Sequence, residues 1–379
     1  MRVHLIEKIS LWQLFILIYV FELGSAIVIG LGNEAKQDAW LAVFLSTLIG
    51  ILITFFYWYL LTRKPGKNLF EIIEFCLGKL FSKVIIMGYI FYFFYIASRV
   101  LRDFGELIVS SIFVLTPTEI ISLTMILVIA YIVYLGLEVL SRTSEIFLPY
   151  LVVFILLVGI FILFSGEMQF ANFRPVLAEG FSPIIDAMFP TLLTFPFGEM
   201  IVFTLIIPYV TRFEYAGKVS MIAVFLSGLF LMYASMVEIA TLGAEMKGRS
   251  NFPLLSAARE ISLLDFIERV DLVIVFVVMF GIIVKVSVFF FGGLKGLELV
   301  FNRPYRLFIL PMSTIIGLIS ITVSDNFAEH IEEGLVLVPY LFHIPFQFVI
   351  PAVILVILLF KNRKVQKRRK NDVQFKNTI

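Results

Sequence analysis

The chain has 379 residues, of which 60% are hydrophobic and 16% aromatic, and its mean hydropathy is +1.02. A soluble domain is closer to half apolar, so this composition indicates a polytopic membrane protein. The single cysteine, Cys76, excludes an internal disulfide. The sequence contains no phosphate-binding loop, dinucleotide fingerprint or nucleophile elbow, and its three histidines are far apart. We therefore expect no enzyme, no cofactor and no metal site.

Apolar runs predict ten membrane spans. They cover about 10–32, 39–62, 84–114, 118–138, 143–165, 183–209, 217–242, 271–294, 305–324 and 335–360. With a cytoplasmic N-terminus, most of the 30 basic residues fall in inside segments, while the acidic loop around Glu332 falls outside. We expect both termini in the cytoplasm. We also expect one ten-helix transmembrane domain, 1–360, and a basic tail, 361–379, that attracts anionic lipid rather than nucleic acid.

Two spans are interrupted where a membrane helix should be continuous. The sixth carries Pro196, Gly198 and Glu199 at its middle, and the first is interrupted at 21–25. Proline and glycine disfavour a helix interior, and a carboxylate at this depth is costly. Irregular backbone is tolerated in a membrane only where it lines a cavity or is buried in protein. We therefore expect both helices 1 and 6 to be broken.

The two halves of the chain match in opposite orientation. Repeat one, 10–165, and repeat two, 183–360, each open with a broken span. Each also has a short amphipathic helix in a loop, at 68–78 on the inside and at 252–267 on the outside. Five spans followed by five inverted spans is the pattern of secondary transporters.

Several short motifs follow one another in a fixed order. They are Glu22–Ser25, Gln37–Trp40, Phe195–Glu199, Phe252–Arg259 and Glu268–Asp271. With the ten-span frame around them, the chain resembles the GerB-type spore germination permeases. These are the B subunits of bacterial germinant receptors, in the amino acid–polyamine–organocation superfamily.

The resemblance implies a leucine-transporter-like fold in the inner membrane of the endospore. It also implies assembly with an A-type subunit and a C-type lipoprotein subunit, and binding of a small germinant such as an amino acid. Glu22 stands where a less charged residue is expected in the first break, and this departure bears on the class of ligand.

The breaks supply the first candidate ligand contacts. Unwound backbone frees N–H and C=O groups, and half-helix ends favour carboxylates and cations, which suits a zwitterion. The candidates are Gly24, Ser25, Phe195, Phe197, Gly198 and Glu199. The alternative is that proline and glycine only kink two packed helices.

Four charges share one face of the third span, namely Arg99, Arg102, Asp103 and Glu106. Their spacing allows mutual neutralisation at i,i+4, Arg99 with Asp103 and Arg102 with Glu106. The alternative is a gate or a ligand-facing role, in which Arg99 and Tyr95, one turn before it, contact the ligand.

Lys285 lies about 20 Å into the eighth span, counting about 1.5 Å per residue from Asp271. This is too deep for snorkelling, so the amine needs an internal partner. In the superfamily that the chain resembles, span eight helps line a sodium site beside the first break. Lys285 is therefore an internal cation that replaces sodium, a plain buried ion pair, or a residue at the inner surface.

These observations favour a germinant-binding receptor subunit that binds its ligand between the two breaks and signals to partner subunits. The second hypothesis is a secondary active amino-acid transporter coupled to protons or sodium. A third is a membrane scaffold that binds no ligand, which the charged residues at the breaks argue against.

The predicted topology can be tested by adding single cysteines. We expect Arg142→Cys to be protected from a membrane-impermeant reagent applied outside the cell, and Arg249→Cys and Glu332→Cys to be labelled. Labelling of Arg142→Cys from outside would overturn the orientation that the basic residues predict.

Overall fold

Continuous apolar runs fold as long helices in this protein. The structure is a computed structural model that describes residues 7–27, 29–260 and 270–362. Its long α-helices are α2 (Ala39–Thr62), α4 (Lys79–Ser111), α5 (Thr118–Leu135), α6 (Leu137–Ser165), α8 (Phe213–Arg249), α10 (Val270–Phe301) and α11 (Ile309–Thr322). The last span joins the π-helix η8 (Pro339–Val349) to the helical segment 350–362.

Within the described residues, nine helices are long and apolar enough to cross a membrane. The remaining predicted span, the first at 10–32, contains only the shorter apolar helix α1 (Leu11–Leu23). The chain is thus an all-α integral membrane protein, as predicted. The basic tail lies outside the described residues beyond Asn362.

Short elements connect and interrupt the long helices. They are η1 (Asn33–Asp38), α3 (Leu69–Leu77), η2 (Phe170–Phe173), α7 (Ser182–Ala187), η3 (Met188–Leu192), η4 (Phe197–Leu205), η5 (Ile207–Tyr209), α9 (Pro253–Arg259), η6 (Tyr305–Phe308), α12 (Phe327–Glu332) and η7 (Glu333–Leu337).

The first break lies where the sequence predicts it. A capping box of Ser10 and Gln13 begins α1, and the helix ends at Gly24, whose N–H donates to the Val20 carbonyl at 2.9 Å. The described residues from Gly24 to Ile27 form turns, and helical structure resumes only at η1. The predicted span 10–32 is therefore a half-helix followed by irregular backbone.

The second break is longer than predicted. The span begins as α7, passes through the π-helix η3 and turns at Phe195 and Pro196 before the 3₁₀-helix η4. Phe189 adds an earlier kink, with an extended φ of −119° and ψ of 127°. Glu199 consequently sits on a 3₁₀-helix that begins directly after the turn.

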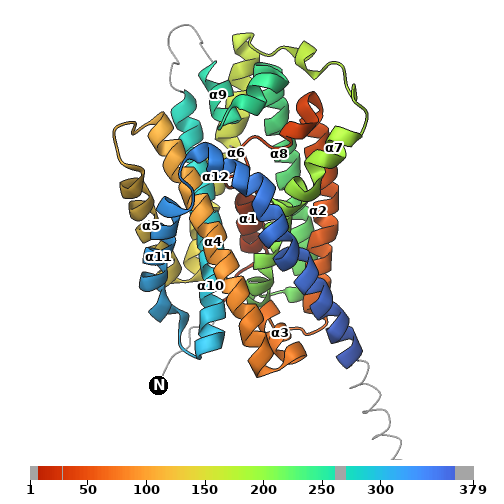
Figure 1. The fold of residues 1–379 in the computed structure, drawn as a ribbon, viewed down its shortest axis with the longest axis vertical. Helices are drawn as coiled ribbons and strands as arrows, with labels where there is room; N and C mark the ends of the chain where they lie inside the picture. Colours follow the sequence, from red (N-terminus) through yellow and green to blue (C-terminus); the bar gives the residue numbers. More distant parts are fainter. Residues whose placement is uncertain (1–6, 28, 261–269, 363–379) are drawn as a thin grey trace, which may run out of the picture.

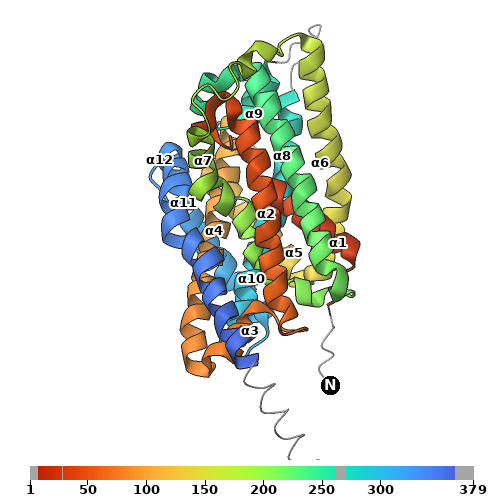
Figure 2. The ribbon, with the colours of Figure 1, turned by 90° about the vertical axis from the view of Figure 1, so that its right-hand side faces the viewer.

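The two predicted loop helices lie at opposite ends of the bundle. Asn68 and Glu71 form a capping box at the start of α3, and Gly78 ends it with a φ of 79°. In two perpendicular views, α3 is at the lower end and α9 at the upper end (Figures 1 and 2). This is the placement expected of an inverted repeat, although residues 261–267 of the predicted outer helix lie outside the described part.

The described ends of the chain lie at the same end of the bundle as α3 (Figure 2). Lys361 donates to the Phe75 carbonyl at 3.1 Å, and Asn362 contacts the Arg63 carbonyl at 3.4 Å. At the other terminus, Ile9 pairs in parallel with Val210 just after η5.

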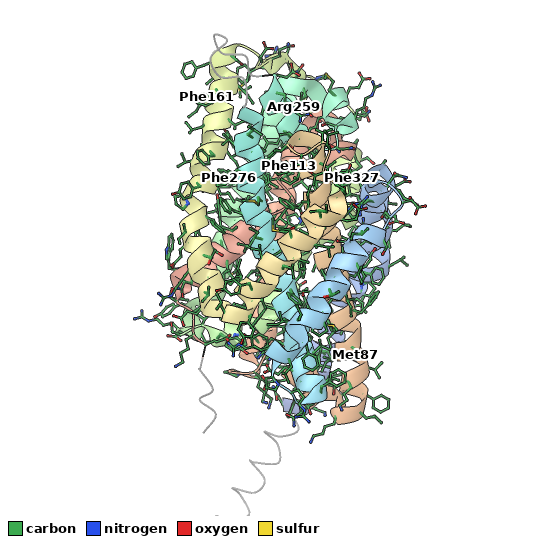
Figure 3. The ribbon with its side chains drawn as sticks, turned by 90° about the vertical axis from the view of Figure 1, so that its left-hand side faces the viewer. Met87, Phe113, Phe161, Arg259, Phe276 and Phe327 are labelled. Atoms are coloured by element: carbon green, nitrogen blue, oxygen red, sulfur yellow. The ribbon has the colours of Figure 1, made fainter. Side chains whose placement is uncertain are left out.

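The half-helix α1 packs against α6, α8 and α10, and its second half, from Ile16 to Leu23, is buried. Apolar side chains such as Met87 and Phe113 cover the outside of the bundle (Figure 3). Such an apolar exterior fits a protein surrounded by lipid.

Gly24 is the point where the first break contacts α10. A Cβ added to Gly24 would lie 2.7 Å from Lys285 Cδ and 2.9 Å from the Phe21 carbonyl oxygen. A Cβ added to Gly281 would in turn lie 3.0 Å from Gly24 Cα. Neither backbone leaves room for a methyl group, so these glycines allow the break to pack directly on α10.

We expect Gly24→Ala to lower stability by about 1–3 kcal/mol, because the added methyl overpacks the contact with Lys285. In a continuous helix the same change would be favourable by about 1 kcal/mol. Gly248→Ala is the matched control, since its methyl meets no atom within 4 Å. Thermal unfolding in detergent measures both, and a Gly24→Ala variant as stable as wild type would contradict the packing described.

Candidate functional site

A cavity lies between the two breaks, α4 and the segment from α12 to η8. Four of the predicted ligand contacts line it, namely Ser25, Arg99, Phe195 and Glu199, together with Asp103. Its remaining wall consists of Ile29, Ile96, Val100, His330, Ile331, Gly334, Leu335, Val338 and His343. The empty space amounts to about 440 Å³ including its opening to solvent, but it is narrow. Only a small molecule fits it in this conformation.

The other predicted ligand contacts support the cavity without lining it. Gly24 packs against α10, and the Phe197 ring fills the space beside Gly50 of α2. The Gly198 carbonyl accepts a hydrogen bond from the Tyr57 hydroxyl at 3.2 Å. Tyr95 accepts a hydrogen bond from Arg99 at 3.2 Å.

Lys285 and Glu199 form a buried ion pair beside the first break. The ammonium lies 2.6 Å from a Glu199 carboxylate oxygen, and the two side chains are 0% and 2% exposed. The ammonium also lies 4.4 Å from the centre of the Phe195 ring and 5.2 Å from that of Phe21. Among the three positions predicted for Lys285, the inner-surface one is wrong.

Ser25 presents an unused polar group to the cavity. Its side chain is fully buried, and its hydroxyl has no hydrogen-bond partner within the described residues. A buried hydroxyl without a partner costs free energy that a ligand hydrogen bond recovers.

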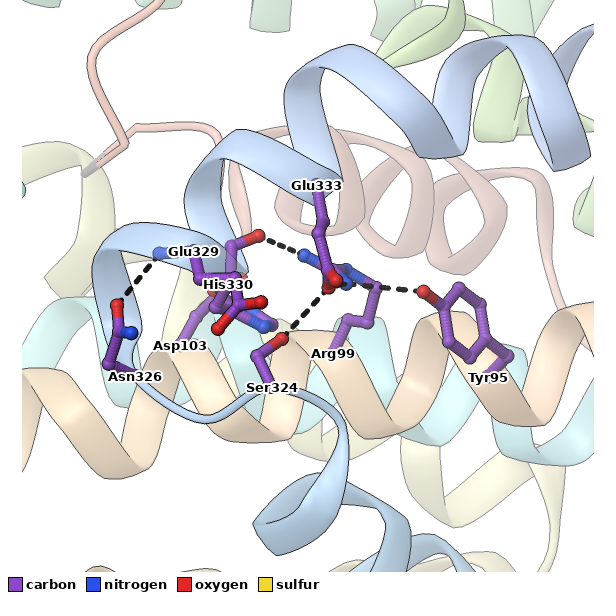
Figure 4. A network of polar contacts seen from close by, with 8 residues as sticks. All are labelled: Tyr95, Arg99, Asp103, Ser324, Asn326, Glu329, His330 and Glu333. Atoms are coloured by element: carbon purple, nitrogen blue, oxygen red, sulfur yellow. Dashed lines mark hydrogen bonds and ion pairs between the residues drawn. The ribbon is translucent and has the colours of Figure 1, made fainter.

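Arg99 connects α4 to α12 and η7 (Figure 4). It donates to the His330 carbonyl and forms an ion pair with Glu333 at 3.4 Å. The same Glu333 carboxylate accepts a hydrogen bond from Ser324 at 3.0 Å. His330 Nε2 lies 2.9 Å from Asp103, one helical turn along α4 from Arg99.

The predicted ion pairs within span three are therefore wrong. Arg99 pairs with Glu333 instead of Asp103, and Asp103 pairs with His330. Arg102 contacts the Ile321 carbonyl at 3.5 Å rather than Glu106. Spacing at i,i+4 brings the charges onto one face, but the neighbouring segment competes for them and provides better-placed partners.

Sequence reasoning missed the polar side chains of the last span. Tyr92 lies 2.7 Å from His343 Nδ1, and Gln347 donates to the Tyr92 hydroxyl at 2.8 Å and to the Thr194 carbonyl at 3.1 Å. His343 and Gln347, four residues apart within an apolar span, were the available signal, since polar groups at membrane depth usually face a bundle interior.

A second buried lysine was also missed. Lys247 belongs to the last turn of α8, which continues past the predicted end of its span. Its ammonium donates to the Leu31 carbonyl at 2.7 Å and to Asn33 at 3.0 Å, and it lies 3.6 Å from Glu238. Lys247 thus attaches the segment after the first break to α8.

A family model and the sequences of individual relatives both match this chain to spore germination proteins. The family model described as "Spore germination protein" matches residues 8–328. Spore germination protein KB of Bacillus subtilis (strain 168) is 34% identical over 97% of this chain and 99% of its own length. Spore germination protein YndE of the same organism is 22% identical over 83% of this chain and 85% of its own length.

A solved structure is similar in fold. The crystal structure of MhsT in complex with L-phenylalanine matches 93% of this chain and 99% of that chain, with a TM-score of 0.68 and 13% identity. The leucine-transporter-like fold that the family resemblance implied is confirmed.

The ion pair between Arg99 and Glu333 can be measured by a double-mutant cycle of Arg99→Met and Glu333→Gln. We expect a coupling energy of about 0.5–3 kcal/mol in detergent unfolding, because each single change leaves its partner unpaired. The control cycle combines Arg99→Met with Asp103→Asn. A larger coupling energy in the control cycle would contradict the pairing with Glu333 and support the pairing of Arg99 with Asp103 that the helical spacing predicts.

Proposed function

The chain belongs to the family of spore germination proteins, and from that premise we propose that it is the germinant-binding B subunit of a spore germinant receptor. Its ligand is a small nutrient such as an amino acid, bound in the cavity between the two breaks. The observation that carries this proposal is that Ser25, Phe195, Glu199 and Arg99, which come from three separate spans, line one cavity.

The cavity wall suits a zwitterion. Glu199 offers a carboxylate to an ammonium group, and Arg99 offers a guanidinium to a carboxylate. Ser25 adds a hydroxyl with no partner among the described residues. The related fold of MhsT accommodates L-phenylalanine, which supports an amino acid as the ligand class.

Lys285 acts as a fixed internal cation in this proposal. Its stem packs against Gly24 and its ammonium pairs with Glu199, so positive charge is already present beside the first break. A sodium ion at the same place would be repelled by the ammonium. Ligand binding is therefore independent of sodium.

Signalling requires a ligand that binds one packing of the bundle more tightly than another. Arg99 faces the cavity and also connects α4 to α12 and η7, so contact with a ligand carboxylate competes with its pairing to Glu333. We regard Arg99 with Glu333 as a gate beside the cavity. Three further charged residues on the same face of α4 belong to this gate, namely Arg102, Asp103 and Glu106. A-type and C-type receptor subunits, in the inner membrane of the endospore, detect the resulting change.

In this arrangement both termini are cytoplasmic, and 1–360 is one transmembrane domain.

The alternative function is a secondary active amino-acid transporter. The fold of MhsT favours it, because the same cavity serves transport when both ends of the bundle open in turn. Uptake of labelled amino acid into proteoliposomes, driven by a proton or sodium gradient, distinguishes the two functions. A transporter accumulates the label, whereas a receptor subunit that only binds its ligand does not.

Spores carrying variants of the chain test the binding site. We expect Glu199→Gln and Arg99→Gln to raise the concentration needed for germination by roughly 10- to 100-fold, since each removes a charge-assisted contact of about 1.5–3 kcal/mol. Each common amino acid is applied alone, in sodium and in potassium buffer, with protein abundance measured by immunoblot.

Arg142→Gln is the control, because Arg142 is exposed on α6 and its ion-pair partner among the described residues is its neighbour Glu138. Unchanged potency in both cavity variants at normal abundance would exclude this binding site. A response that needs sodium would contradict the role of Lys285.

A further inference from the structure

Glu22 is a carboxyl group in an unusual position. It is 0% exposed in the last turn of α1, and neither carboxylate oxygen has a hydrogen-bond partner in the part of the chain that the structure describes. The carbonyls at the end of a half-helix carry partial negative charge, which disfavours an anion there. An ionised carboxylate in this position would be a buried charge without compensation.

The charged groups facing Glu22 supply too little positive charge. Among the described residues they are Lys285 of α10, whose stem packs against Gly24, and Glu199 of η4, its ion-pair partner, and the Tyr57 phenol of α2 is a further titratable neighbour. Lys285 is already paired with Glu199 at 2.6 Å. One ammonium therefore faces two carboxyl groups.

The other helices packed on α1 do not correct this imbalance. The buried carboxylate of α8, Glu238, lies with its own cation, Lys247. On α6, Arg142 is exposed and pairs with Glu138. The cluster of Glu22, Glu199 and Lys285 is neutral only if one carboxyl group carries a proton or a second cation is bound.

We propose that Glu22 is a proton-binding site, and that it exchanges its proton when Glu199 separates from Lys285. With the proton bound, Lys285 and Glu199 are paired and Glu22 is a neutral acid. When Glu199 moves away, the O–H bond of Glu22 breaks, the proton passes to water and the new carboxylate pairs with Lys285. No electron transfer occurs, and the ammonium has one carboxylate partner in each state.

A proton fits this position better than a metal cation. It forms a covalent bond to one carboxylate oxygen, whereas a metal ion needs several oxygen ligands. Lys285 also repels a metal ion placed beside Glu22.

The exchange couples ligand binding to proton release, a step that rests on the proposed function. A ligand ammonium that binds Glu199 competes with Lys285, and the freed Lys285 then favours ionised Glu22. Binding an amine in the cavity therefore releases one proton from a group that the ligand does not touch.

Infrared spectroscopy of the purified full-length protein in detergent at neutral pH tests the site without any ligand. We expect the carbonyl stretch of a protonated carboxylic acid in wild type and its loss in Glu22→Gln. The wild-type minus Glu22→Gln difference removes contributions from other buried acids such as Glu238.

Three further variants sharpen the test. Glu199→Gln frees Lys285, so Glu22 ionises and the same band disappears, with no further loss when Glu22→Gln is added. Lys285→Met leaves both acids without a cation, so the band is retained and a second appears. Glu138→Gln, on the exposed face of α6, leaves the carboxylic-acid band unchanged.

Absence of the band from the wild-type difference spectrum, including the case of a sodium ion bound at ionised Glu22, overturns the proposal. Retention of the band in Glu199→Gln overturns the exchange. If Glu22→Gln does not fold, the wild-type minus Glu199→Gln difference reports the same band. Because no ligand is present, a failed germination response with a normal infrared result rejects only the proposed function.

Discussion

A buried ammonium must find its counter-charge inside the protein, and in this fold that requirement joins both breaks at one place. Lys285 sits against Gly24, where α1 ends, and pairs with Glu199, which follows the turn at Phe195 and Pro196. The irregular backbone at each break is costly in a membrane unless it is enclosed by protein. The ion pair holds α10 and η4 around the two breaks, so the cavity depends on it.

The cavity lies between this pair and a second ion-pair cluster around Arg99. Lys285 connects α10 to η4, and Arg99 connects α4 to α12 and η7. Glu199 pairs with Lys285, Arg99 contacts Glu333 and the His330 carbonyl, and both side chains also line the cavity. Groups that stabilise the packing are thus the groups that a ligand can reach, which is the condition for a ligand to shift the balance between two packings.

The sequence predicted those features that depend on neighbouring residues. Apolar runs located the spans, and Pro196, Gly198 and Gly24 located the breaks, because helix propensity and proline geometry act locally. Partners distant in the chain were not predictable. The side chain of Arg99 meets Glu333 and His330, more than 200 positions away, and no local pattern identifies them. The depth of Lys285 in its span predicted that it needs an internal partner. That this partner is Glu199 could be seen only from the fold.

The charges around the cavity favour a zwitterion over an anion. Lys285 and Arg99 each already pair with a carboxylate, Glu199 and Glu333, while Glu22 has no cation of its own in the described chain. An anionic ligand that takes Arg99 leaves Glu333 without its partner and adds negative charge to an acid-rich wall. In the proposed exchange, a zwitterion brings a compensating ammonium, so Glu199 binds the ligand while Lys285 turns to Glu22. Glu22, whose burial costs free energy, therefore gives the displaced lysine a partner. This makes exchange of ion pairs possible without leaving a charge unpaired.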